Sequence, residues 1–266
     1  MKNNKFIEKT LELSDYIDIN LVKKFIVFDE ISSTNSKAKE LARNGKDEGT
    51  IVIARMQKKG RGRFDRVWQS PDGGLYLSII LRPKLTPDKT TLLPLVGALA
   101  VSKTINLFGL CSKIKWPNDV RINRRKTAGI LLESESEEKQ VHYVVLGIGI
   151  NLNIDINRFS KELRNVVTSL SYELNGNVDY QKFLKILLST FDKYYAMFIN
   201  RDFDTILKEW KMQSDTLGKR IKIVTSSDEI IGKAYDVDKS GFLIALTESG
   251  EYKKIMSGDC IYFDEL

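Results

Sequence analysis

The residue pattern changes near residue 217, and this change constrains the fold more than any other feature of the chain. Before it, strand-like apolar runs alternate with segments of helical periodicity, as in α/β proteins. After it, short apolar runs alternate with turns rich in Ser, Asp and Gly, which predicts five short strands in a small antiparallel barrel. We therefore expect an α/β domain over residues 1–217, beginning with a short extension over 1–20, and a small β-barrel domain over 218–266.

Within the first region, β-branched and apolar runs predict strands, and apolar spacing near 3.6 residues predicts helices. The predicted strands cover residues 25–28, 50–57, 75–81, 129–133 and 141–153, with one more starting at 114 and interrupted by Pro117. The predicted helices cover 33–44, with Ser33 or Thr34 as cap and Gly45 as stop, and a buried segment over 92–108. Helical periodicity continues over 179–214, residues 121–126 read as a hairpin turn, and one short helix is expected within 1–20.

Composition excludes several classes of protein. Hydrophobic residues make up 42% of the chain and charged residues 29%, which is typical of an ordered globular protein. No apolar run approaches the roughly 18 residues of a membrane span, so no membrane association is expected. The first 20 residues lack an uninterrupted apolar core and a small-residue cleavage site, so we expect a cytoplasmic protein.

The chain has one histidine and two cysteines, which limits its chemistry further. A His-rich zinc site is excluded, and a Ser-His-Asp triad would have to use His142, which begins an apolar run and reads as structural. Cys111 and Cys260 form no CxxC pair and no metal spacing, and no structural disulfide is expected in a reducing compartment.

Residues 57–76 form a segment rich in Gly and Arg that could bind a small anionic ligand. Glycine lets the backbone approach a ligand closely, and arginine offers a planar fork to phosphate or carboxylate. Trp68 could stack on a purine ring. A solvated basic loop and a single-stranded nucleic-acid contact remain open from these residues alone. The segment matches neither a P-loop nor a dinucleotide fingerprint.

Four further motifs each allow a functional and a structural interpretation. Residues 115–120 place an amide and a carboxylate at a strand end, or form a simple turn. Lys126 precedes a buried strand and could point a charge into a cleft, or lie on the surface. Two glycines in 147–153 indicate close approach of a flat ligand, or a bulge. Residues 32–35 read as a helix N-cap that also offers free N–H groups to a carbonyl or an anion.

Taken in order, these motifs resemble those of the biotin protein ligase family. GRGR, a following Arg and Trp, and SPxGGLY appear within Gly60–Tyr76, and the others are KWPND at Lys115–Asp119, KxxGIL at Lys126–Leu131, GxGIN at Gly147–Asn151 and STN at Ser33–Asn35. The resemblance covers roughly residues 25–155 and is highly specific, since five ordered motifs coincide. The expected architecture is an α/β (α+β) catalytic domain, in which helices flank a mixed β-sheet, followed by an SH3-like barrel.

The resemblance implies a two-step reaction. The carboxylate of biotin attacks the α-phosphorus of ATP, giving biotinyl-5′-AMP and pyrophosphate, and a lysine of a biotin carboxyl carrier domain then takes the biotinyl group. The implied cofactor is Mg²⁺ with ATP, and the metal ligands stay open. The implied catalytic residues are Arg63 and Lys126, to which we add Asp119 as a hypothetical base. The implied biotin-binding residues are Ser33, Thr34, Asn35, Gln57, Arg61, Gly62, Arg63, Lys126, Gly129 and Gly149, and those for ATP or the adenylate are Arg61, Arg63, Arg66, Trp68, Asn118, Lys126 and Asn151.

The chain departs from the bifunctional members of that family. Only some 20 residues precede the α/β region, too few for a helix-turn-helix domain, so we expect the monofunctional type and no operator binding. The net charge of +7 could assist docking to an acidic carrier. Phe64 and Asp65 within the arginine segment have no assigned role. The resemblance also allows a homodimer. A lipoate ligase, which shares the fold, and a nucleic-acid-binding regulator are the alternatives.

Overall fold

The computed structural model describes residues 13–16, 18–138, 140–225 and 228–265, and its largest element is a seven-stranded mixed sheet. The strand order is β1-β2-β3-β7-β6-β5-β4, in which only the β1–β2 pair is parallel. The strands are β1 (Lys24–Ile31), β2 (Thr50–Gln57), β3 (Leu75–Leu81), β4 (Ser112–Lys115), β5 (Asp119–Ile122), β6 (Arg125–Glu137) and β7 (Gln140–Ile150).

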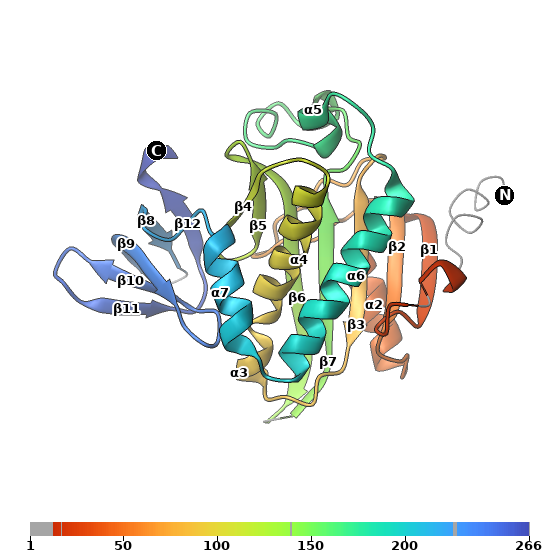
Figure 1. Ribbon diagram of the computed structural model, residues 1–266, viewed down its shortest axis with the longest axis horizontal. Helices are drawn as coiled ribbons and strands as arrows, with labels where there is room; N and C mark the ends of the chain where they lie inside the picture. Colours follow the sequence, from red (N-terminus) through yellow and green to blue (C-terminus); the bar gives the residue numbers. More distant parts are fainter. Residues whose placement is uncertain (1–12, 17, 139, 226–227, 266) are drawn as a thin grey trace.

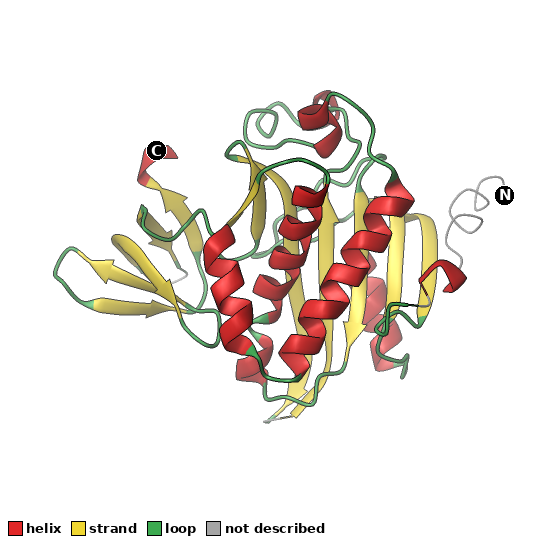
Figure 2. Cartoon of the chain, viewed as in Figure 1, coloured by secondary structure: helices red, strands yellow, loops and turns green. Residues whose placement is uncertain are grey.

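Helices cover both faces of this sheet (Figures 1 and 2). The long helices α4, α6 and α7 lie on one face, and α2 packs on the other face against β2, β3 and β7. The helices are α2 (Thr34–Arg43), α3 (Pro87–Thr90), α4 (Leu93–Leu107), α5 (Leu170–Leu174), α6 (Tyr180–Ile199) and α7 (Phe203–Gln213), with short 3-10 turns at Leu13–Tyr16, Ile156–Arg158 and Phe263–Glu265. The expected mixed sheet flanked by helices is thus confirmed.

A second, antiparallel sheet follows α7, as the short runs near the C-terminus predict. Its order is β11-β10-β9-β8-β12, and it lies beside α7 and β4 (Figure 1). The strands are β8 (Arg220–Val224), β9 (Glu229–Val237), β10 (Leu243–Thr247), β11 (Tyr252–Ile255) and β12 (Asp259–Tyr262). This arrangement is consistent with an SH3-like domain.

Helix α4 forms the centre of the core. Eleven of its fifteen residues are buried, so its apolar surface faces protein all round, as predicted for 92–108. The α3–α4 segment Pro87–Leu107 is, among the described residues, the one helix long and apolar enough to cross a membrane, with a mean hydropathy of 1.3. This corrects our reading that no run approaches that length. The burial of 72% of its most apolar window identifies it as a core helix.

The helical region 179–214 is two helices rather than one. Arg201 adopts a left-handed φ of 62°, which ends α6, and the side chain of Asp202 then accepts a hydrogen bond from Thr205 N to cap α7. Within α6 the buried residues recur every three or four positions, from Phe183 to Phe198, and they pack on α4.

Other local predictions can be compared with the structure directly. Strands 50–57 and 75–81 have the predicted bounds, and α2 is capped by Ser33, whose side chain accepts from Ser36 N. The predicted turn at 121–126 narrows to Asn123 and Arg124, both with left-handed φ, because β5 and β6 extend into it. The helix expected within 1–20 falls mostly outside the described residues, as does part of the turn at 226–228.

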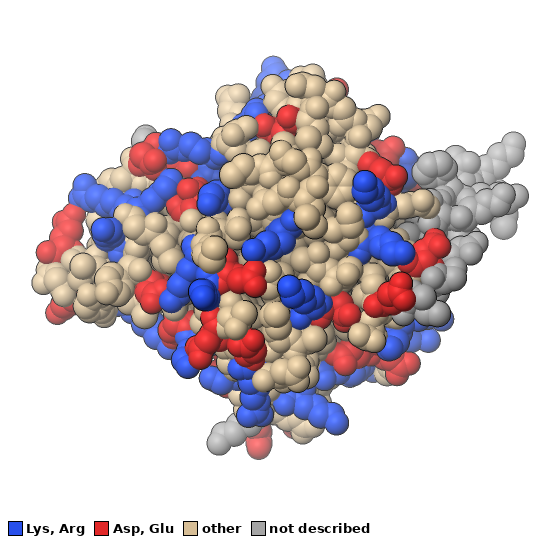
Figure 3. Space-filling model, viewed as in Figure 1, with Lys and Arg blue, Asp and Glu red and all other residues tan. Residues whose placement is uncertain are grey.

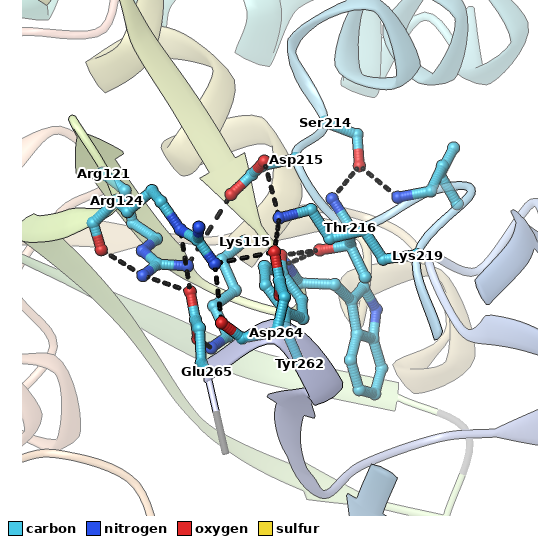
Figure 4. A network of polar contacts seen from close by, with 12 residues as sticks. Lys115, Arg121, Arg124, Ser214, Asp215, Thr216, Lys219, Tyr262, Asp264 and Glu265 are labelled. Carbon is cyan, nitrogen blue, oxygen red and sulfur yellow. Dashed lines mark hydrogen bonds and ion pairs between the residues drawn. The ribbon is translucent and has the colours of Figure 1, made fainter. Parts of the chain in front are cut away.

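A polar cluster joins the end of the main sheet to the second sheet (Figure 4). Lys115 and Arg121 on β4 and β5 form ion pairs with Glu265, and the hydroxyl groups of Thr216 and Tyr262 are 2.8 Å apart. Beside this cluster Trp116 is 2% exposed; its backbone N–H donates to Thr216 Oγ1 and its indole N–H to the carbonyl of Gly241. The second sheet is therefore fixed directly to the segment that holds the KWPND motif.

Candidate active site

A cavity of about 520 Å³ lies where the main sheet, the second sheet and residues 58–74, here named the arginine loop, come together. All fifteen residues that the sequence singled out line it. They are Ser33, Thr34, Asn35, Gln57, Arg61, Gly62, Arg63, Arg66, Trp68, Asn118, Asp119, Lys126, Gly129, Gly149 and Asn151. They come from segments separated by more than a hundred residues, so the fold and not local sequence brings them together.

Two glycines form a flat surface on the sheet inside this cavity. Gly129 on β6 and Gly149 on β7 are cross-strand partners, and the register of β7 is regular there, so the bulge interpretation is wrong. A Cβ on Gly149 would lie 2.6 Å from Trp68 Nε1, and one on Gly129 would lie 3.0 Å from Trp68 Cζ3. Close approach does explain these glycines, and the flat group that lies on them here is the indole of Trp68.

A buried chain of hydrogen bonds connects the start of α2 to β2 and β3. Gln57 Oε1 accepts from the backbone N–H of Thr34 at 2.8 Å and from its hydroxyl at 3.1 Å. Ser78 Oγ lies 2.8 Å from Thr34 Oγ1 and 2.6 Å from Asn35 Oδ1, and Asn35 Nδ2 donates to Glu133. A Cβ on Gly147 would lie 2.0 Å from Asn35 Oδ1, so this glycine makes room for the chain. The result is a rigid polar wall at one end of the cavity.

The arginine loop is closed by its own backbone and by the second sheet. Gly62 N donates to Arg66 O, and Trp68 N donates to Gly60 O. Phe64 and Asp65, for which the sequence offers no role, both adopt left-handed φ angles of 53° and 57° and form the tip. The side chain of Arg66 pairs with Asp259 at the start of β12. The C-terminal region that holds the second sheet therefore contributes part of the cavity wall through Gly258–Ile261.

Arg63 differs electrostatically from the other cations of the cavity. Arg61 pairs with Glu133, Arg66 with Asp259, and Lys126 with Asp119 at 2.6 Å. Among the described residues, by contrast, Arg63 donates to uncharged oxygens: Asn118 Oδ1 at 3.2 Å, Gly258 O at 2.8 Å and Ser257 Oγ at 3.4 Å. Burial lowers the pKa of Arg63, against the opposing effect of the carboxylates of Asp259 and Asp119. A desolvated cation without an anionic partner favours binding of an anion.

The KWPND segment is fixed to the neighbouring strand. Asn118 Nδ2 donates to Ile130 O at 2.6 Å, and Ile130 N donates to Asn118 O at 3.0 Å. Asn118 therefore presents its Oδ1 to Arg63, and Asp119 faces Lys126. The interpretation of this motif as a simple turn is thus incomplete, since the side chains of Asn118 and Asp119 both line the cavity.

One buried acceptor in the cavity wall has no partner among the described residues. Asn151 is 1% exposed; its Nδ2 donates to Thr168 O, while its Oδ1 accepts nothing. The indole N–H of Trp68 and the hydroxyl of Thr127 are also buried without a partner. Buried polar groups are normally satisfied, so an unpaired acceptor here indicates the place of a ligand donor.

Several residues that line the cavity were not predicted from the sequence. They include the apolar residues of the loop after β7 (Phe159, Leu163 and Val167) and the C-terminal segment Gly258–Ile261, which no local signal connects to the arginine loop. Cys260 belongs to this segment, and burial raises the pKa of its thiol to about 12. Cys111 is exposed and unpaired. His142 is half exposed on β7, does not line the cavity, and lies 3.5 Å from Glu137.

The sequence matches known protein families over most of its length. Residues 27–151 match the Biotin/lipoate A/B protein ligase family, and residues 216–262 match the Biotin protein ligase C terminal domain. The Bifunctional ligase/repressor BirA of Bacillus subtilis is 40% identical over 88% of this chain and 72% of its own length. The Biotin--[acetyl-CoA-carboxylase] ligase of Paracoccus denitrificans is 35% identical over 82% of this chain and 92% of its own.

A solved structure gives the same result. The biotin protein ligase from Aquifex aeolicus in complex with biotin and ATP superimposes with a TM-score of 0.77 and 29% identity, over 90% of this chain and 98% of that one. The chain belongs to the biotin protein ligase family. The expected family, fold and class of enzyme are confirmed, and the lipoate ligase and nucleic-acid regulator are not favoured. On the face shown in Figure 3, lysines and arginines are interspersed with carboxylates rather than gathered into one basic surface.

Proposed function

We propose that this protein joins biotin to a lysine of a biotin carboxyl carrier domain in two steps within the cavity. In the first, an oxygen of the biotin carboxylate attacks the α-phosphorus of ATP, and the bond to pyrophosphate breaks. In the second, the lysine amine of the carrier attacks the carbonyl carbon, AMP leaves with the bonding electrons, and the amine loses a proton. Activation is needed because a free carboxylate is a poor acyl donor.

The observation that carries this proposal is the desolvated guanidinium of Arg63, which has uncharged partners and faces the cavity. In the proposal it binds the carboxylate of biotin and the α-phosphate, where negative charge increases during the first step. Hydrogen bonds to charged groups are each worth about 1.5–3 kcal/mol, and a planar fork suits these oxygens.

Lys126 and Asp119 have linked roles in the proposal. Lys126 would leave its ion pair with Asp119 to contact the carboxyl and phosphate oxygens. The carboxylate of Asp119 is then free to accept the proton of the incoming lysine in the second step. Asn118 orients Arg63 between the two domains, so it acts on the phosphate through that guanidinium.

The biotin pocket of the proposal is the polar wall formed by Ser33, Thr34, Asn35 and Gln57, together with the glycine surface. Polar groups there would satisfy the ureido ring, and Gly129 and Gly149 would face its apolar part. Because the indole of Trp68 lies on those glycines in this structure, biotin reaches them only after the indole moves. We propose that Trp68 then packs on the adenine as the arginine loop closes over both ligands.

Mg²⁺ would arrive with the phosphates of ATP. Among the described residues, no group of three or more His, Cys, Asp or Glu side chains could hold a metal ion alone. Mg²⁺ usually binds through one or two carboxylates and substrate phosphates, and Asp119 could fill this role in the first step only, before it acts as the base in the second. The ion would neutralise phosphate charge. Cytoplasmic location, a homodimer and the lack of operator binding stay predictions.

A pyrophosphate exchange assay tests the first step without a carrier. With Mg²⁺ present, labelled pyrophosphate should enter ATP only when biotin is added, because formation of the adenylate is reversible. Lipoate in a parallel reaction should give no exchange. Exchange that occurs equally without biotin, or that depends on lipoate, would contradict the proposal.

Substitution of Asn151 by alanine should weaken ATP selectively. We propose that the unpaired Oδ1 accepts from the exocyclic amine of adenine, and a net hydrogen bond of about 1–1.5 kcal/mol corresponds to roughly a tenfold rise in the half-saturating ATP concentration. The half-saturating biotin concentration should change less than about twofold on the same argument. Asn153→Ala is the matched control, since both polar atoms of Asn153 are bonded to Val178 and it does not line the cavity. An equal effect of both substitutions on ATP would exclude this role.

A further inference from the structure

A row of polar contacts connects α2 to β6 on the face of the sheet opposite α4. Asn35, Lys39 and Arg43 recur every four residues and so lie along one side of α2. Glu133 and Glu135 recur every two residues and point to the same face of β6. Asn35 and Lys39 both donate to Glu133, at 3.0 and 2.8 Å, and Arg43 donates to Glu135 at 2.8 Å. Such a row of contacts by itself holds a helix on a sheet.

Glu133 differs from Glu135, the other carboxylate in this row of contacts, in two respects. Its side chain is 14% exposed, whereas that of Glu135 is 45% exposed. It also has a second cationic partner that does not come from α2, since Arg61 Nη2 forms an ion pair at 3.2 Å with the same carboxylate oxygen that Lys39 contacts. Arg61 belongs to the arginine loop and lines the cavity, whereas neither Lys39 nor Glu135 does.

The carboxylate of Glu133 is well suited to hold a charge in place. Burial raises its pKa, but the hydrogen bonds from Lys39 and Asn35 and the positive charges of Arg61 and Lys39 outweigh this effect and keep the pKa below its ordinary value. It is therefore ionised near neutral pH. Its Oε2 accepts a hydrogen bond from Asn35, and its Oε1 accepts one from Lys39 and also forms the ion pair with Arg61, so one carboxylate contacts both α2 and the arginine loop.

We propose that Glu133 is a positioning residue that couples the Ser33–Asn35 segment of the cavity to the arginine loop. It orients the side chain of Asn35 through one oxygen and restrains Arg61 through the other. The biotin end of the cavity and the arginine loop therefore keep a fixed position relative to each other. The effect on biotin binding rests on the proposed function, whereas the restraint on the loop does not.

Trypsin cleavage of the ligand-free, full-length chain tests the restraint directly. The protease cuts after Arg61, Arg63 and Arg66, and cleavage reports the population in which the loop is open. In Glu133→Gln the initial rates at these three sites should rise about fivefold or more, at an unchanged cleavage pattern elsewhere. Glu135→Gln and Lys39→Met are the matched controls and should stay within about twofold of the parent, because both leave the contact with Arg61 intact.

A second readout separates positioning from general stability. In the pyrophosphate exchange assay, Glu133→Gln should raise the half-saturating biotin concentration about fivefold, while the rate at saturating biotin falls less than about twofold. If Glu133→Gln does not fold, Arg61→Gln removes the same contact from the other side. Cleavage after Arg63 and Arg66 should then rise to the same extent.

Two results would overturn the proposal. One is a Glu133→Gln variant that trypsin cuts in the loop no faster than Glu135→Gln. The other is a Lys39→Met variant with the same increase as Glu133→Gln, since Glu133 would then serve only to anchor α2. Faster loop cleavage in Glu133→Gln, together with no biotin-dependent exchange in the unmodified protein, would support the restraint and contradict the proposed function instead.

Discussion

Replacing Lys126 by methionine is expected to lower the rate of biotin-dependent pyrophosphate exchange by about 10²–10³-fold while the protein stays folded. The ammonium group is already placed in the cavity, 2.6 Å from Asp119, and it needs only to exchange that carboxylate for ligand oxygens. A preorganised donor of this kind is worth about 3–4 kcal/mol of barrier. Methionine keeps the length of the side chain and removes the charge.

The stability of this variant should change little. Lys126 and Asp119 are 32% and 26% exposed, and partly exposed ion pairs contribute about 0–1 kcal/mol. Lys113→Met is the matched control, because Lys113 is an exposed lysine on β4, which is separated from β6 by β5, and it does not line the cavity. It should retain full activity. A Lys126→Met variant with more than about a tenth of the parent rate would show that this ammonium group does not act on the transition state.

Replacing Trp116 by alanine is expected to destabilise the protein by about 3–5 kcal/mol. The indole is among the largest fully buried side chains, and its N–H donates at 3.0 Å to the carbonyl of Gly241, in the turn between β9 and β10 of the second sheet. The substitution therefore opens a cavity and also leaves that carbonyl unpaired, at the junction in Figure 4 where Thr216 and Tyr262 meet.

Urea unfolding of the two proteins measures this loss. Trp116→Phe is the useful comparison, since it keeps one aromatic ring while it removes the hydrogen bond and leaves a smaller void, and its cost should therefore lie below that of the alanine variant. We also expect the second sheet of Trp116→Ala to lose its fixed position, which would release Arg63 and Arg66 from Gly258 and Asp259. A loss below about 1 kcal/mol in the alanine variant would contradict the central place of this indole in the junction.

Local patterns predicted the elements that local forces determine. The bounds of β2 and the cap of α2 at Ser33 follow from β-branched runs and from a side chain that accepts its own helix N–H. The break between α6 and α7 was missed although Asn200, Arg201 and Asp202 carried a signal. An Asn followed closely by an Asp cap marks a helix end and a new start, but the apolar periodicity on both sides hides it.

Ordered motifs predicted residues that line the cavity, but they did not predict Glu133 and Asp259, which contact two of these residues. Glu133 lies at the end of the predicted strand 129–133, where an alternating run of Glu and Ser begins, and its partner Asn35 is 98 residues away. Asp259 lies in a segment that the sequence identifies only as a turn, 193 residues from Arg66. Contacts over such separations depend on how the sheets pack, so no local period or propensity reports them.

The glycines of β7 are a second example of a contact that local sequence does not report. The sequence indicated close approach of a flat group at Gly149, and the structure supplies one in the indole of Trp68. Which group would occupy that surface depended on the path of the arginine loop, whose left-handed residues Phe64 and Asp65 are not glycines and gave no turn signal.

The most direct measurement of the central claim is the mass of a biotin carboxyl carrier domain after incubation with this protein, ATP, Mg²⁺ and biotin. We predict a mass gain of one biotinyl group on a single lysine. The gain should be lost in Arg63→Ala and retained in Arg43→Ala, a matched exposed arginine on α2 that pairs with Glu135 away from the cavity. An unmodified carrier in the biotin reaction, or modification of a lipoyl carrier in a parallel reaction with lipoate, would contradict it.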